Sequence, residues 1–163
     1  MQIGMFYQIQ VPKPWTPNSD YDRHWEMMDQ VVFAEEQGFD SVWLADHQFR
    51  TEWSHSSAPD VTLAAISQRT SRIRLGIAVA VPPVQHPLHI AARTATLDIL
   101  SNGRVDLGVG RSGYPYQMAA FGVDLENATG MVDEALEIIP RAWAEGEFSY
   151  QGKHFQIPTR EVH

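Results

Sequence analysis

The 163-residue chain carries 12 Lys and Arg against 20 Asp and Glu, a formal net charge of −8, and it contains no cysteine. An acidic chain is a poor candidate for binding nucleic acid or anionic membranes, and without cysteine it can form no disulfide, thiolate nucleophile or cysteine zinc site. The N-terminus has no basic region ahead of an apolar stretch, and no apolar run is long enough to span a membrane, so we expect one soluble cytoplasmic domain.

Apolar periodicity and turn residues divide the chain into alternating strands and helices. Strands are expected at residues 2–7, 39–45, 73–81 and 104–109. Helices are expected at residues 22–37, from Pro59 to about 69, from Pro87 to about 101, and at about 128–144. The first helix shows Trp25, Met28 and Val32 at helical spacing, and Gly38 supplies the residue that ends it.

The last predicted helix should turn Met131, Ala135, Ile138 and Trp143 inward. Pro140 lies within this helix and should kink it or shift its start.

The stretch Ile73–Pro87 is the element around which the others are arranged. Its first half is an aliphatic run without polar alternation, which is typical of a strand buried on both faces of a parallel sheet. Prolines at positions 82, 83 and 87 end the strand near Val81 and begin a rigid loop, where we expect the chemistry.

The predicted strands from the second onward begin at Phe39, Ile73 and Arg104, about thirty residues apart, which is the length of one strand-helix unit. Right-handed crossovers fold such repeats into either an open doubly wound sheet or a TIM (β/α)₈ barrel. A barrel takes about 250 residues, so four units predict half a barrel.

Polar residues follow the predicted strands at the point where each strand ends. Asp46-His47 follows the second strand and Arg111 the fourth. Reactive groups at the carboxyl ends of successive strands are typical of barrel enzymes, although open α/β sheets can share this feature. Residues 146–163 alternate like a hairpin and predict an insertion before a missing fifth strand.

Residues 108–113 spell the G-x-G-x-x-G pattern of dinucleotide-binding sites. A Rossmann unit opens a helix inside this pattern, whereas Tyr114-Pro115-Tyr116 follows here, which argues against that fold. Small residues that let the backbone approach a flat ring or a phosphate, with Arg111 as an anion clamp, fit better. A tight turn with a surface arginine is the structural alternative.

Histidines provide the other candidate chemistry. His47 could act as base, acid or hydrogen-bond donor, or could be a structural residue bonded to backbone. His86 and His89 have the spacing of metal ligands, but no H-E-x-x-H or cysteine accompanies them, so a zinc site is not expected. Loop residues His55, Trp53 and Trp15 either shape a substrate entrance or are simply exposed.

Three stretches carry a resemblance to a known family. They are Gly-Phe-Asp-Ser-Val-Trp-Leu-Ala-Asp-His-Gln-Phe (38–49), Ser-Arg-Ile-Arg-Leu-Gly-Ile-Ala-Val-Ala-Val-Pro-Pro-Val-Gln-His-Pro (71–87) and Leu-Ser-Asn-Gly-Arg-Val-Asp-Leu-Gly-Val-Gly-Arg (100–111). The sequence resembles the bacterial luciferase-like flavin-dependent oxidoreductases over nearly its whole length. The resemblance implies a (β/α)₈ barrel, with this chain as its N-terminal half, that binds reduced FMN, or the deazaflavin F420 in a sister branch.

The resemblance also implies site residues at the ends of the second and third strands. His47 matches the active-site histidine, beside an acidic residue that is Asp46 here. The pair Ala78-Val79 matches a place where the family often has a non-prolyl cis peptide against the flavin ring.

After the fourth strand, Gly110 and Arg111 match the turn that approaches the flavin, with Arg111 as a phosphate ligand and Gly113 and Tyr114 nearby. The function implied is an FMN-dependent monooxygenase that oxygenates a small organic substrate with O₂, using FMN reduced by a separate flavin reductase. In such an enzyme the cofactor does the difficult step and protein groups orient it and manage protons.

Three other functions stay open. An F420-dependent oxidoreductase is one, because an Asp-His pair also occurs in the deazaflavin branch. A noncatalytic flavin-binding half-barrel and a metal-dependent barrel hydrolase are the others. Alone, the chain is expected to be inactive and to form a homo-oligomer or to pair with a complementing second half, because its sheet would have open edges.

Overall fold

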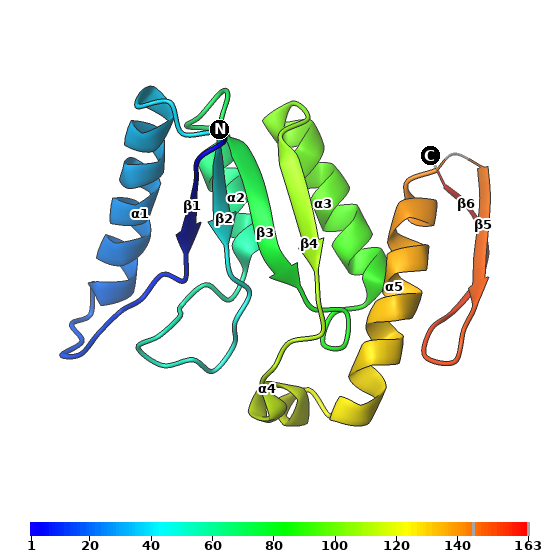
Figure 1. Cartoon of the computed structure of the whole chain (residues 1–163). Helices are drawn as coiled ribbons and strands as arrows, with labels where there is room; N and C mark the ends of the chain where they lie inside the picture. The colour runs from blue at the N-terminus through cyan, green and yellow to red at the C-terminus, as the bar shows by residue number, and fades with distance from the viewer. Residues whose placement is uncertain (145, 163) are drawn as a thin grey trace. The chain divides into compact units, whose positions relative to one another are not determined.

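The computed structural model describes residues 1–144 and 146–162 (Figure 1). In chain order the elements are β1 Gly4–Tyr7, α1 Ser19–Glu36, β2 Ser41–Leu44, α2 Pro59–Ser67, β3 Arg74–Ala80, α3 Pro87–Ser101, β4 Val105–Val109, α4 Pro115–Ala120, the 3₁₀ helix η1 Leu125–Asn127, α5 Ala128–Ala142, β5 Gly146–Gln151 and β6 Gln156–Val162. The strand-helix alternation confirms the sequence-based order. Two compact units make up the chain, Met1–Val79 with Leu97–Gly108 and Ala80–Thr96 with Val109–His163.

The first four strands form one sheet in the order β1-β2-β3-β4. β2 pairs in parallel with both β1 and β3, and Leu44 stands level with Tyr7 on one side and Ile77 on the other. Consecutive neighbours in parallel pairing require a helical crossover between strands, and α1 and α2 provide the first two. An α/β fold with a parallel sheet is therefore confirmed.

The two faces of this sheet differ in burial. Val42, Leu44 and Leu75 are fully buried and share one face of the sheet, because Val42 pairs with Leu75 and alternate residues of a strand point to the same side. On the opposite face of the sheet, Phe6 of β1 is 56% exposed, and Trp43 of β2, with which it pairs, is partly exposed. Among the described residues of the first unit, no helix packs over this second face in Figure 1, and it is called here the open face.

Helix α1 buries Met27, Met28, Val31 and Ala34. Trp25, which helped to define its periodicity in the sequence, is 45% exposed. The helix ends where expected, because Gly38 has φ +90°, a conformation that favours glycine at the end of a helix.

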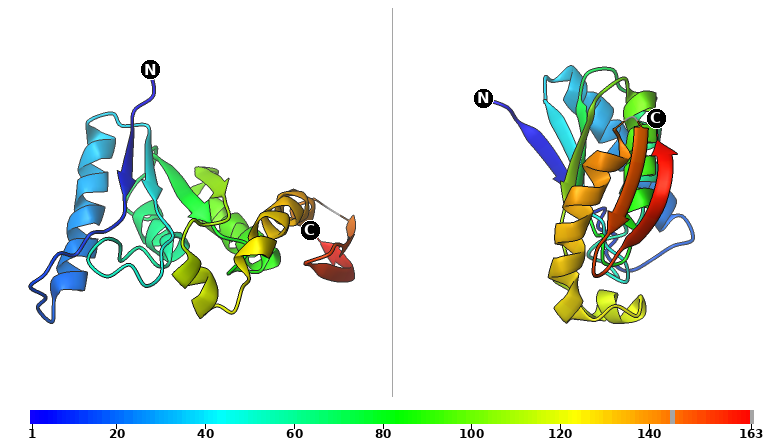
Figure 2. Two further views of the ribbon diagram at one scale, coloured as in Figure 1. Left: turned by 60° about the horizontal axis from the view of Figure 1, so that its bottom comes forward. Right: turned by 90° about the vertical axis from the view of Figure 1, so that its right-hand side faces the viewer.

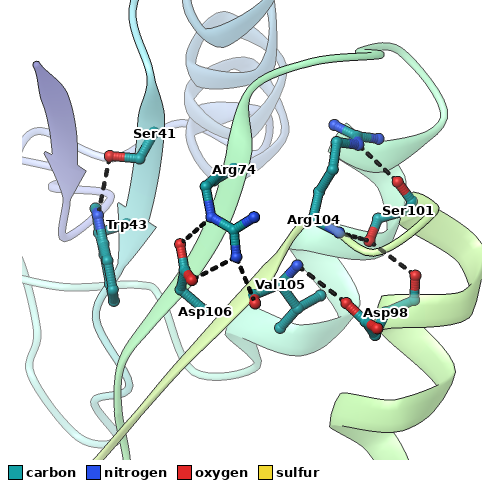
Figure 3. A network of polar contacts seen from close by, with 8 residues as sticks. All are labelled: Ser41, Trp43, Arg74, Asp98, Ser101, Arg104, Val105 and Asp106. Carbon is teal, nitrogen blue, oxygen red and sulfur yellow. Dashed lines mark hydrogen bonds and ion pairs between the residues drawn. The ribbon is translucent and has the colours of Figure 1, made fainter. Parts of the chain in front are cut away.

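Arg104 anchors the amino-terminal side of β4 (Figure 3). Its buried guanidinium donates hydrogen bonds to the carbonyl oxygens of Ser67 at the end of α2, of Thr70 beyond it, of Ser101 at the end of α3, and of Ile73. The carbonyls of Ser67 and Ser101 are among those that helix ends leave without intrahelical partners. One arginine thus fixes two helix ends and the start of a strand.

Glu35 fixes the start of β3 in a similar way. Its carboxylate accepts hydrogen bonds from the backbone N–H groups of Ser71, Arg72 and Ile73, at 2.9, 2.8 and 2.6 Å. Burial acts to raise the pKa of the Glu35 carboxyl, but the backbone donors outweigh it and hold that pKa below its ordinary value.

In the second unit, β5 and β6 form an antiparallel hairpin beside α5 (Figure 2). Ile138 of α5 packs in one apolar cluster with Phe148, Phe155 and Ile157 of the hairpin segment. Glu134 of α5 accepts hydrogen bonds from three consecutive backbone N–H groups of the turn, residues 153–155. The predicted hairpin is confirmed, although its last residue, His163, lies outside the described part.

The inward face predicted for α5 is partly wrong. Ala135 and Ile138 are fully buried, but Trp143 follows the last residue of α5 and is 44% exposed, and its indole N–H donates a 2.9 Å hydrogen bond to the carbonyl oxygen of Ala91. Pro140 lies inside α5, which runs from Ala128 to Ala142.

Candidate functional site

Asp46 and His47 follow the carboxyl end of β2. The strand pairing is continued by a 3.0 Å hydrogen bond from the Ala45 N–H to the carbonyl oxygen of Tyr7. Asp46 is 4% exposed, and its Oδ1 accepts a 2.6 Å hydrogen bond from the side-chain amide of Gln48. A carboxylate is thus held at the sheet edge by a neighbouring residue.

Ser56 fixes the backbone of this strand end. Its hydroxyl, which is almost fully buried, donates a 2.6 Å hydrogen bond to the carbonyl oxygen of Ala45. Its own carbonyl oxygen accepts a 2.9 Å hydrogen bond from the His47 N–H. The loop from 46 to 58 therefore folds back onto the strand that precedes it, and His47 has a defined backbone position.

The electrostatic surroundings of His47 favour its neutral form. Burial, and to a lesser extent the positive charge of Arg50, lowers the pKa of the His47 imidazole below its ordinary value of 6.5. At neutral pH the ring is therefore neutral, with one nitrogen that can donate and one that can accept a hydrogen bond.

The end of β3 carries Ala78 and Val79, joined by a non-prolyl cis peptide bond as the family resemblance implied. Both residues are partly buried. The pairing of β2 with β3 ends at Leu44 and Ile77, so Asp46 and Val79 each lie two residues beyond the last paired residues of these strands. Gly108 of β4 lies against them, since a Cβ at Gly108 would come 3.1 Å from Val79 Cγ1.

The loop after β1 is tied to the loop after β2. Val11 donates to the Glu52 carbonyl oxygen, and His55 donates to the Ile9 carbonyl oxygen, at 3.2 and 3.0 Å. His55 Nδ1 lies 2.5 Å from an oxygen of Asp20, which anchors the loop to α1.

The aromatic residues proposed for an entrance lie on these two loops. Trp15 packs edge-on against His55 with ring centroids 6.0 Å apart, and Trp53 is 63% exposed. His55 is therefore a structural link between the loops as well as a neighbour of Trp15.

In the second unit, the turn after β4 begins with a 3.0 Å hydrogen bond from the Gly110 N–H to the carbonyl oxygen of Ala80. Arg111 is exposed. Ser112 has φ +62°, and its hydroxyl donates to the buried amide oxygen of Gln117 and accepts from the Tyr114 N–H. A Cβ at Gly113 would meet no atom within 4 Å, so nothing nearby requires glycine there.

The G-x-G-x-x-G segment lacks the Rossmann arrangement. Helix α4 begins at Pro115, after the motif has ended, and a Rossmann site needs the helix N-terminus within the motif. The turn therefore presents Arg111 on a loop before a short helix.

His86 accepts a 3.2 Å hydrogen bond from the Leu88 N–H through Nδ1 and packs edge-on against Phe155. It therefore caps the start of α3. In the described part of the chain no group of three or more His, Cys, Asp or Glu side chains is placed to hold a metal ion. No helix described has the length and apolar character needed to cross a bilayer.

Comparison with known proteins decides the family, because the sequence matches "Luciferase-like monooxygenase" over residues 1–163. The chain belongs to the luciferase-like monooxygenase family. The oxygenase component of flavin-dependent trigonelline monooxygenase from Acinetobacter baylyi is 28% identical, over 97% of this chain and 43% of the relative. An F420-dependent glucose-6-phosphate dehydrogenase from Microbacterium testaceum is 35% identical, over 85% of this chain and 43% of the relative.

Among solved structures, the monooxygenase RslO1 from Streptomyces bottropensis superposes with a TM-score of 0.87 at 30% identity. That match covers 96% of this chain and 47% of RslO1. The chain thus spans less than half the length of the luciferase-like relatives it matches.

Within the luciferase-like fold, Asp46 and His47 follow β2, and Ala78 and Val79 lie near the end of the neighbouring strand β3, all in the first unit. Gly110, Arg111, Gly113 and Tyr114 lie together in the second unit, and each group is described within its own unit. Sequence reasoning missed Ser56 and Gln117, whose roles depend on hydrogen bonds to the backbone of the strand end and to Ser112. No local sequence pattern indicates that Ser56 and Gln117 are buried.

Proposed function

We propose that this chain is the amino-terminal half of a flavin-dependent monooxygenase that uses reduced FMN and O₂ to oxygenate a small organic substrate. The observation that carries the proposal is His47, whose backbone is fixed just after the carboxyl end of β2 and whose burial favours the neutral imidazole. Active sites of parallel α/β enzymes lie at this edge.

The proposed whole protein is a (β/α)₈ barrel. The open face of the sheet supports this, since Phe6 and Trp43 would be covered when further strands close a barrel around them. The free edges of β1 and β4 would then each pair with one of the added strands. In this proposal residues 1–163 belong to a single barrel domain, and the hairpin at 146–163 is an insertion before the fifth strand.

The residues present fit a flavin nucleotide in chemical type. Arg111 offers an exposed guanidinium for a phosphate, beside a glycine whose Cβ position is open. In the other unit, Ala78 and Val79 offer a small apolar surface for a flat ring. Reduced flavin, when bound, supplies the electrons that activate O₂.

Each residue then has a limited task. Arg111 binds and orients the phosphate, with Gly110 and Tyr114 shaping the turn around it. His47, being neutral at pH 7, accepts or returns a proton at a ring nitrogen during turnover. The loops after β1 and β2, which are hydrogen-bonded to each other, limit the access of water to the His47 imidazole.

An F420-dependent oxidoreductase is the second candidate. Two observations favour it, namely the Asp46-His47 pair and the 35% identity to the dehydrogenase from Microbacterium testaceum. The monooxygenase would also need a separate flavin reductase as a partner. The name of the relative from Acinetobacter baylyi, an oxygenase component, supports this.

Mass spectrometry of the ligand released from the complete protein distinguishes the candidates. FMN in the released ligand, together with O₂-dependent oxidation of an organic substrate when a flavin reductase is added, supports the monooxygenase. F420 supports the oxidoreductase. A complete protein that binds neither cofactor in a fluorescence titration contradicts both.

A further inference from the structure

The segment that holds the backbone of His47 is itself held by the residue next to it. The His47 N–H donates a 2.9 Å hydrogen bond to the carbonyl oxygen of Ser56, and His55 immediately precedes Ser56. The His55 N–H donates a 3.0 Å hydrogen bond to the carbonyl oxygen of Ile9, in the loop after β1. Its imidazole Nδ1 lies 2.5 Å from Oδ1 of Asp20, in the first turn of α1. His55 thus ties the His47 segment to two other parts of the first unit.

The chemistry of the Asp20 contact fixes the orientation of the His55 ring. A carboxylate oxygen only accepts hydrogen bonds, so the hydrogen of this contact lies on Nδ1 of His55. In the described part of the chain the other ring nitrogen, Nε2, is buried and has no hydrogen-bond partner. Asp20 therefore supplies the hydrogen bond that orients the ring. Because the Asp20 side chain is 66% exposed, solvent screens its charge, and the contact acts mainly through its geometry.

The indole of Trp15 restricts the same ring from another direction. Its ring lies edge-on to His55, at 6.0 Å between centroids. The indole N–H donates a 2.8 Å hydrogen bond to the carbonyl oxygen of Val11, whose own N–H donates to the carbonyl oxygen of Glu52. The neighbour that packs on His55 is therefore itself held between the loops after β1 and β2.

We propose that Asp20 and His55 are positioning residues for His47. They hold the segment whose Ser56 carbonyl fixes the His47 backbone, and so determine where the imidazole stands during turnover. The inference rests on the proposed function, in which His47 moves a proton. A displacement of about 1 Å at a catalytic group can lower a rate by as much as about 10²-fold, so contacts outside the site affect turnover.

Amide hydrogen exchange in the complete protein tests the anchoring without any measurement of activity. His55→Ala and Asp20→Ala should each make the His47 N–H exchange about ten-fold faster or more, because the segment that accepts its hydrogen bond opens more often. His55→Asn keeps an N–H donor close to the position of Nδ1 and should restore most of the protection. Asp20→Ala changes an exposed residue, so it keeps the test available if His55→Ala does not fold.

Two matched controls lie beside the altered residues. Asp22→Ala removes another carboxylate from the first turn of α1. Ser54→Ala removes a buried hydroxyl that has no hydrogen-bond partner in the described part of the chain, one residue before His55. Exchange of the His47 N–H should stay within about two-fold of the unmodified protein in both controls, since neither removes a contact of His55.

A double-mutant cycle in steady-state kinetics tests whether the effect passes through His47. His55→Ala should lower kcat of the complete enzyme by about ten-fold and change KM for the organic substrate by less than about two-fold. In a His47→Ala background the same substitution should cause no further loss, because residues that act as one unit are not additive. His55→Asn should recover most of the lost kcat.

Unchanged exchange of the His47 N–H in both His55→Ala and Asp20→Ala would overturn the inference. An equal loss of kcat in the presence and absence of His47 would also overturn it, since His55 would then act independently of that residue. Normal turnover of the His47→Ala enzyme would instead contradict the proposed function of His47. The exchange measurement would still decide whether Asp20 and His55 hold its backbone.

Discussion

The hydroxyl of Ser56 donates a 2.6 Å hydrogen bond to the carbonyl oxygen of Ala45, across a loop that starts and ends at the same strand end. The backbone of Ser56 also accepts a hydrogen bond from His47. A buried serine therefore determines where the candidate catalytic histidine leaves β2, and the energetic importance of that contact can be measured.

Ser56→Ala should lower the free energy of unfolding by about 1–3 kcal/mol, because the buried carbonyl of Ala45 loses its donor. Urea denaturation measures this change. Ser57→Ala is the matched control, since Ser57 is exposed and the substitution leaves its backbone hydrogen bonds with His55 and Gln48 in place. Equal effects of the two substitutions would remove Ser56 from its anchoring role.

His47→Ala should leave the fold intact and lower turnover of the complete enzyme by about 10² or more, the effect of losing a general acid or base. Steady-state kinetics at saturating reduced flavin measure the turnover number. His24→Ala, on the solvent side of α1, is the control. Normal turnover in the His47 variant would assign His47 a structural role instead.

Arg111→Ala should weaken flavin binding to the complete protein by about 1.5–3 kcal/mol, the usual contribution of a charged hydrogen bond. A flavin fluorescence titration gives the dissociation constant. Arg93→Ala, on the exposed side of α3, is the comparison. If the Arg111 variant binds flavin as tightly as the unmodified protein, the phosphate is held elsewhere.

The Glu35 carboxylate should make the protein sensitive to acid. Its folded-state pKa is held below the ordinary value of 4.5, so its stabilising contribution is complete above pH 4.5 and is lost as the pH falls through the lowered value. Glu35→Gln should therefore be less stable than the unmodified chain at pH 7, and the difference should shrink in acid. Urea denaturation as a function of pH tests this, with its exposed neighbour Glu36→Gln as the control, which should show no such convergence.

The features that the sequence predicted correctly have local causes. Gly38, Asn102 and Gly103 all adopt positive φ at helix ends, as glycine and asparagine do there. The aliphatic run after Ile73 becomes β3, and the cis peptide at Ala78-Val79 follows from the family resemblance.

The features that it missed depend on contacts distant along the chain. Trp25 satisfies helical periodicity, but periodicity does not say which of two apolar faces is the core. Helix α4, with six residues, is too short to show a period. Ser56 lies in a loop, and only the folded chain brings its hydroxyl to the Ala45 carbonyl.

Size-exclusion chromatography with in-line light scattering and flavin absorbance, applied to the protein from its natural source, tests the central claim most directly. If this chain is half of a flavin-binding barrel, flavin absorbance will elute with a species heavier than 18.4 kDa, either a longer polypeptide or an assembly. A monomer of 18.4 kDa that carries one flavin per chain, or the absence of flavin from every species after incubation with FMN and F420, would contradict it.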